Sequence, residues 1–137
     1  MVQDFADRRK RVVSELRSVS GRFSITCDMW KASAKKQSYI VVTLHWIDEA
    51  WRLKNIVLDF KYVPLRHTGE NMKSIVMDSL KEYHLSHRGL CVTTDGAANM
   101  KLVFRGLYAD MEKERRIYGK KAADGKSTQG WILIFIS

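Results

Sequence analysis

Two aspartates stand in matching positions, each directly after a short apolar stretch with the alternation of a β-strand. Asp28 follows FSITC at residues 23–27, and Asp95 follows LCVTT at residues 90–94. If the two strands are neighbours, their backbones lie about 4.8 Å apart. This is close to the ~3.5–4 Å that separates the ions of a two-metal phosphoryl-transfer site. The pair therefore predicts metal-assisted cleavage or joining of nucleic-acid strands.

Each aspartate also has a purely structural interpretation. Asp28 can end a strand before Trp30, and Asp95 can cap the helix that begins after it. For either residue alone the structural role is favoured. For the two together a metal site is favoured, because hard divalent cations bind several carboxylate oxygens held in a fixed geometry.

The elements that must hold these aspartates can be predicted from periodicity. Apolar residues at helical spacing indicate helices, and β-branched runs with period two indicate strands. The predicted elements are a helix at 4–19, strands at 23–29, 38–47 and 53–62, a helix at 69–84, a strand at 90–95 and a helix at 97–117. The third strand is predicted to place Ile56, Leu58 and Phe60 on one face.

The connections in this order predict the topology. Short links between the first three strands imply antiparallel hairpins, and the crossover helix implies a parallel fourth strand beside the first. We therefore expect an α/β fold with a three-strand antiparallel meander, a parallel fourth strand and helices packed on the sheet. The predicted domain bounds are an N-terminal amphipathic helix at 1–20, the α/β domain at 21–118, and a linker with an apolar tail at 119–137.

Composition limits the partners. The chain has 137 residues and a net charge of +9, from 24 basic and 15 acidic residues. This charge favours polyanionic partners such as DNA, although a basic surface without a partner fits it as well. Cys27 and Cys91 lack the spacing of a zinc site and are expected to be buried reduced thiols, which suits an intracellular compartment. No membrane span or signal peptide is expected.

Five short motifs, in this order and at these separations, resemble the start of the catalytic domain of hAT-superfamily DNA transposases, which has a ribonuclease H-like fold. The motifs are TCDMW at 26–30, SYIVVTLHWID at 38–48, LDF at 58–60, HTGEN at 67–71 and TDGAAN at 94–99. The resemblance implies a DDE triad that binds two Mg²⁺ or Mn²⁺ ions, with Asp28 as the first carboxylate and Asp95 as the second. The third member, a glutamate on a late helix, has no counterpart here, because Glu112 and Glu114 come too early. A Cys-x-x-His element that usually follows the second aspartate is also missing.

The sequence therefore predicts a transposase-derived fragment that binds DNA, is nuclear, and keeps a two-aspartate remnant of the metal site. It is expected to be catalytically incomplete alone, and to act with other transposase chains or as a homo-oligomer. The alternative is a non-enzymatic module that binds nucleic acid or protein, supported by the basic cluster at 8–11. A different two-aspartate hydrolase ranks last, because no phosphate loop or nucleophile motif supports it.

The sequence also gives expectations for one histidine, two tryptophans, one asparagine and the apolar tail. His45 is expected to be packed or hydrogen-bonded, and Trp30 and Trp46 to supply core or contact area, with base stacking as an option beside a metal site. Asn99 is expected to orient Asp95, contact a phosphate or bond at the helix start. The apolar tail WILIFI at 131–136 either forms a fifth strand or is an exposed end left by truncation, and truncation is weakly favoured.

Overall fold

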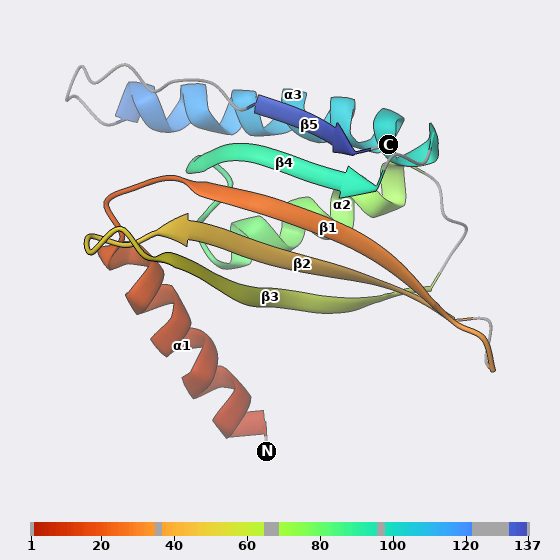
Figure 1. Ribbon diagram of the computed structural model, residues 1–137, viewed down its shortest axis with the longest axis horizontal. Coiled ribbons are helices and arrows are strands. Elements are labelled where there is room, and N and C mark those ends of the chain that lie inside the picture. The colour runs from red at the N-terminus through yellow and green to blue at the C-terminus, as the bar shows by residue number, and fades with distance from the viewer. Residues whose placement is uncertain (1, 35–36, 65–68, 96–97, 122–131, 137) are drawn as a thin grey trace.

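The computed structural model describes residues 2–34, 37–64, 69–95, 98–121 and 132–136. Over this part of the chain, three helices and five strands form one layered α/β unit (Figure 1). In chain order they are α1 (Val2–Ser18), β1 (Phe23–Ala32), β2 (Gln37–Ile47), β3 (Leu53–Val63), α2 (Gly69–Glu82), β4 (Gly89–Asp95), α3 (Ala98–Lys121) and β5 (Ile132–Ile136).

The strands form one mixed sheet of order β3-β2-β1-β4-β5 within the described residues. β1 pairs antiparallel with β2, and β2 pairs antiparallel with β3, which makes the meander. β4 then lies parallel to β1 on its other side, reached through the crossover helix α2. The predicted meander with a parallel fourth strand is confirmed, and the arrangement is ribonuclease H-like.

The hydrophobic core lies between one face of the sheet and the helices. In β2 every second residue is buried, as the β-period requires. α2 and α3 contribute apolar stripes to the same core, and Figure 1 shows both behind the sheet. The fully buried core side chains include Phe23, Ile25, Cys27, Ile40, Val42, Leu44, Val76, Leu80, Phe104, Leu107 and Met111. No described element covers the opposite face of the sheet, which is the open face of the molecule.

One prediction about β3 is wrong. Ile56, Leu58 and Phe60 were expected on one face, but the register between β2 and β3 shifts between Val42 and Thr43. This irregularity inserts one extra residue into β3, and an extra residue sends the following side chains to the other face. Leu58 is buried, whereas Phe60 is 53% exposed on the open face.

α1 is attached to the sheet by its C-terminal half. Leu16 is buried in the core, and the guanidinium of Arg88 donates hydrogen bonds to the backbone carbonyls of Leu16 (2.8 Å), Val19 and Gly21 (3.0 Å). Arg88 also lies over the ring of Phe23, 4.9 Å from its centroid. A cation at a helix C-terminus satisfies carbonyls that have no partner within the helix.

The apolar tail forms a strand. β5 pairs parallel with β4, from Cys91 opposite Ile132 to Asp95 opposite Ile136. Of the two alternatives for the tail, the fifth strand is the one that the structure shows. α3 extends to Lys121, and most of the predicted linker lies outside the described residues. The bounds 1–20, 21–118 and 119–137 stay a prediction. Within the described part of the chain, no helix has the length and apolar character needed to cross a membrane.

Candidate metal centre

The β-register brings the two predicted aspartates to the same level of the sheet. β1 and β4 pair in parallel from Ser24 opposite Cys91 to Cys27 opposite Thr94. Asp28 and Asp95 are the next residues on the two strands, directly after the last pair. The prediction that the two aspartates stand on adjacent strands is therefore confirmed for the backbone. The side chain of Asp95 lies outside the described part of the structure, as does that of Asn99.

The strand predicted at 23–29 is longer than expected, and Asp28 does not stand at its end. β1 continues to Ala32, because its other edge stays paired with β2 as far as Ala32 opposite Gln37. What ends at Asp28 is the pairing with β4. Asp28 therefore lies on a strand that is still held by β2, just beyond its last pair with β4. This position is both fixed and accessible.

The strand alternation separates Asp28 from the core. Cys27 is fully buried on the helix-covered face, whereas Asp28 is exposed on the open face. Within the described residues Asp28 forms no hydrogen bond or ion pair. Burial raises the pKa of the Cys27 thiol far above its usual range, and the charge of Asp28 adds to this effect. Cys27 is thus a protonated core residue and is unsuited to bind a metal.

The histidine and the two tryptophans named in the sequence-based expectations lie on β1 and β2. His45 Nε2 lies 3.2 Å from Thr26 Oγ1, which confirms the expectation of a hydrogen-bonded histidine. Trp46 is a core residue in edge contact with Phe23, at 5.8 Å between ring centroids. Trp30 is instead 56% exposed and lies on the open face, two residues beyond Asp28.

Trp30 belongs to a row of rings that the sequence did not predict. Its ring lies 5.9 Å from that of Tyr39, which stacks on Phe60 at 4.9 Å and contacts Tyr62 at 5.7 Å. These four residues, here called the aromatic row, cross β1, β2 and β3. The alternation of Phe60 and Tyr62 in the sequence could have indicated it, but only with the irregularity in β3 known in advance.

A third acidic ligand is not found in the part of the chain that the structure describes. There, no group of three or more histidines, cysteines, aspartates or glutamates is arranged to hold a metal ion. Glu112 forms an ion pair with Arg115 at 2.8 Å, and Glu114 forms one with Lys81 at 3.4 Å. Both glutamates lie on α3 and form ion pairs there.

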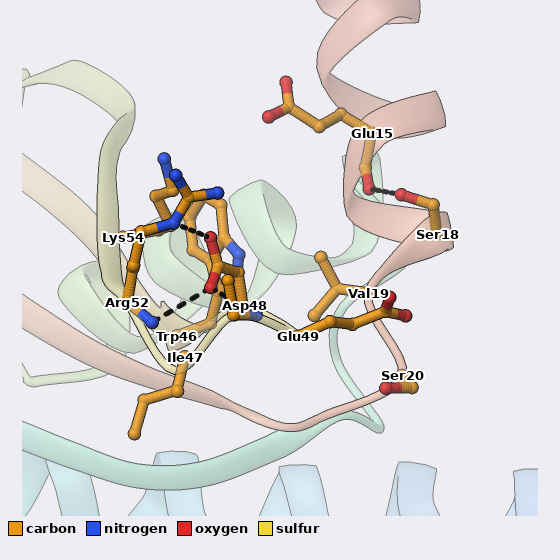
Figure 2. A pocket seen from close by; sticks show the side chains of 11 residues that line it. Glu15, Ser18, Val19, Ser20, Trp46, Ile47, Asp48, Glu49, Arg52 and Lys54 are labelled. Atoms are coloured by element: carbon orange, nitrogen blue, oxygen red, sulfur yellow. Dashed lines mark hydrogen bonds and ion pairs between the residues drawn. The ribbon is translucent and has the colours of Figure 1, made fainter.

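A groove of about 500 Å³ lies elsewhere, between the end of α1 and the turn from β2 to β3 (Figure 2). Its lining mixes Glu15, Glu49, Arg52 and Lys54 with the carboxylate of Asp48. That carboxylate accepts hydrogen bonds from the backbone N–H groups of Ala50 and Arg52, each at 2.9 Å, and from Arg52 Nε at 2.9 Å. Asp48 therefore stabilises the turn and is not part of the aspartate pair.

The sheet order and the helices that cover one of its faces define a ribonuclease H-like domain. Comparison with known families agrees, since residues 26–122 match the family model described as the ZBED1 RNase-like domain. The chain belongs to this family.

Known relatives carry transposase and regulator names. The chain is 27% identical to a Zea mays protein named as an AC transposase, over 108 residues that make up 79% of this chain and 13% of the relative. It is 29% identical over 111 residues to a protein of Talaromyces stipitatus named as the transcriptional regulator tpeD, covering 81% of this chain and 13% of that one. It is 24% identical over 102 residues to the zinc finger BED domain-containing protein DAYSLEEPER of Arabidopsis thaliana, covering 74% and 14%. The chain thus spans a small part of the length of these relatives.

Proposed function

We propose that this chain is an hAT-type, transposase-derived domain that binds DNA and carries two of the three acidic ligands of a DDE metal site. One observation supports the metal site above others: the parallel register ends at Cys27 and Thr94, so Asp28 and Asp95 are the next residues on neighbouring strands. The proposal includes a nuclear location, which fits the transposase and BED-domain names of the relatives. It also includes assembly with other transposase chains or as a homo-oligomer.

The donor chemistry fits magnesium or manganese. Asp28 is exposed and free of ion pairs within the described residues, so its carboxylate oxygens are available to a hard cation. Asp28 and Asp95 would hold the ion, which when bound would stabilise charge on the attacking and leaving oxygens of a phosphodiester. Two carboxylates leave several coordination positions without a protein ligand, so we expect weak metal binding and little catalysis by this chain alone.

Manganese binding tests the pair directly. We expect Mn²⁺, titrated into the protein and followed by isothermal calorimetry, to bind to the wild type, and Asp28→Asn and Asp95→Asn each to weaken this binding by about tenfold or more. Asp110→Asn is a matched control, because Asp110 is a carboxylate on α3 that pairs with Lys73 at 3.3 Å. Equal Mn²⁺ binding by the wild type and both pair variants would refute the metal site.

Catalytic incompleteness has a separate test. Supercoiled plasmid incubated with Mg²⁺ or Mn²⁺ should show no more nicking with the wild type than with Asp95→Asn. Robust nicking that Asp95→Asn abolishes would show that the chain is a complete nuclease, and would contradict this part of the proposal.

The alternative function is a non-enzymatic nucleic-acid-binding module. It is favoured by the net charge of +9 and by Arg8, Lys10 and Arg11, which are exposed on α1. Binding through phosphates releases counterions, so affinity falls steeply with salt. A steep fall in duplex-DNA affinity between low and physiological salt, unchanged by Asp28→Asn and without metal, would favour this alternative. Affinity that is independent of salt would count against it.

A further inference from the structure

A second groove lies between α1 and the edge strand β3, away from the aspartate pair. It has a volume of about 350 Å³, and α1 contributes Phe5, Arg8 and Arg9 to its lining. β3 contributes Val57 and Phe60, which belong to the open face, and also Asp59, which faces α2 and bonds to Ser79. Because side chains from both faces of β3 line it, the groove follows the free edge of that strand. Figure 1 shows α1 next to this edge of the sheet.

The groove has an apolar lining that is open to solvent. Phe5 is 59% exposed, Val57 59% and Phe60 53%. These side chains come from an exposed helix turn and an edge strand, and they converge on one groove instead of being scattered. Scattered exposed apolar residues are ordinary, but a convergent group with polar residues beside it is typical of an interaction site.

The charge beside this apolar lining is positive. Arg8 is exposed and has no ion pair within the described residues. The guanidinium of Arg9 lies 5.1 Å from the ring centroid of Phe5 and 5.7 Å from that of Tyr83, and pairs with Glu82 at 3.4 Å. Its Nε is buried and has no hydrogen-bond partner among the described atoms.

Among the described residues that line the groove, Asp59 is the acidic one, and it is already engaged. Its carboxylate accepts hydrogen bonds from the Ser79 hydroxyl at 2.8 Å and from the Phe60 N–H at 3.0 Å, and pairs with Lys61 at 3.3 Å. Asp59 therefore does not neutralise Arg8, and the groove presents unpaired positive charge beside apolar side chains.

We propose that this groove binds an acidic, apolar peptide segment of a partner protein, with its carboxylates on Arg8 and Arg9 and its large apolar side chains against Phe5, Val57 and Phe60. A nucleic-acid backbone would satisfy the arginines but leave these three side chains without an apolar partner. A second copy of the chain is disfavoured, because each copy carries +9. The inference does not depend on the aspartate pair or on any metal.

Peptide selection followed by matched variants tests this inference. Random peptides of about twelve residues, displayed on phage, would be selected on the wild-type chain, and the most enriched peptide would be synthesised with a fluorescent label. We expect carboxylates next to leucine, phenylalanine or tryptophan in the enriched sequences. Fluorescence anisotropy should then show binding that Arg8→Glu weakens about tenfold or more, since reversing a contacting charge costs both attraction and specificity.

Lys10→Glu is the matched control, because it makes the same charge change on the opposite side of the same helix. It should alter peptide affinity less than about twofold, whereas Phe5→Ser should weaken it about fivefold or more. Circular dichroism would verify that each variant is folded.

Three outcomes would overturn the inference. The first is an equal loss in Arg8→Glu and Lys10→Glu, which would indicate non-specific attraction. The second is undiminished binding of a peptide whose carboxylates are replaced by amides. The third is a labelled single-stranded oligonucleotide that binds more tightly than the peptide and depends on both Arg8 and Phe5, which would assign the groove to nucleic acid.

Discussion

The two faces of the sheet are ordered by different physical means. The covered face is held by burial, with side chains such as Val42, Phe104 and Leu107 fully removed from water by α2 and α3. The open face carries Asp28 and the aromatic row, and no described element packs on it. Its side chains owe their positions to the pairing register of the strands.

The covered face therefore holds the residues that stabilise the fold, and the open face holds residues that are accessible to partners. Burial of apolar area is the dominant stabilising contribution, so changes on the covered face should alter stability first. The open face contributes less burial and keeps reactive and aromatic groups accessible. Changes there should leave the fold largely intact and alter binding.

The same substitution on the two faces gives the sharpest test. Phe104→Ala should lower the free energy of unfolding by about 3–5 kcal/mol, because it leaves a cavity in the core. Phe60→Ala should cost about 1 kcal/mol, mainly through the lost stacking on Tyr39. Urea denaturation followed by circular dichroism measures both. Equal losses would mean that the open face is packed against something, and would break the comparison.

The next largest loss of stability is expected at Arg88, on the covered side of the sheet. Arg88→Ala should destabilise the protein by about 2–3 kcal/mol, because hydrogen bonds from a charged donor are among the strong ones. Its partners are the carbonyl of Leu16 in the last turn of α1 and that of Gly21 just after the helix. Arg88→Lys keeps the charge but loses the fork geometry, so we expect an intermediate loss. If Arg88→Lys matched the wild type, charge alone would hold α1.

Much of the fold could be predicted from the sequence, because the period of apolar residues follows directly from helix and strand geometry. The meander, the crossover helix and β4 were all located this way. In α3 the spacing by four predicted Val103, Leu107 and Met111 on one face. Leu107 and Met111 are buried, and the side chain of Val103 lies outside the described part of the structure. Met100 and Phe104 were missed, although both are buried as well. A helix that covers a sheet buries a stripe wider than one residue in four.

The site was less predictable, because a register depends on long-range pairing. The aspartates could be nominated from local sequence, but their alignment depends on which residues of β1 and β4 pair. The irregularity in β3 has no signature in its sequence, and it moved Phe60 from the expected face, shared with Leu58, to the aromatic row. Arg88 was missed for a similar reason, since its partners in α1 are about seventy positions away in the chain and no local pattern marks them.

The turn between β2 and β3 tests whether charge, as well as burial, stabilises the fold. Hydrogen bonds to Asp48, first from the backbone N–H of Arg52, lower the pKa of its carboxyl below the ordinary value. A depressed folded-state pKa stabilises the fold above the unfolded pKa, and this contribution is lost as the pH falls through the folded pKa. Asp48→Asn should therefore be less stable than the wild type at pH 7, by less than Arg88→Ala.

The pH dependence distinguishes this effect from a simple loss of shape. The difference in unfolding free energy between the wild type and Asp48→Asn should stay constant down to about pH 5 and shrink below about pH 4, where the unfolded carboxyl protonates. Denaturation at several pH values measures it. A difference that is the same at pH 3 and pH 7 would show that the charge of Asp48 does not matter.

The smallest expected effect is a gain in stability at the same turn. Trp51 has a φ of 60°, and its side chain is 87% exposed. The left-handed backbone is therefore strained, and burial of the ring offsets little of that strain. Trp51→Gly should raise the free energy of unfolding by about 0.5–1 kcal/mol, since the left-handed strain of about 1–2 kcal/mol is partly offset by the greater chain entropy of glycine. Trp51→Ala is the matched control, because it removes the ring but keeps the strain. If alanine stabilised as much as glycine, the exposed ring and not the backbone strain would be the cause.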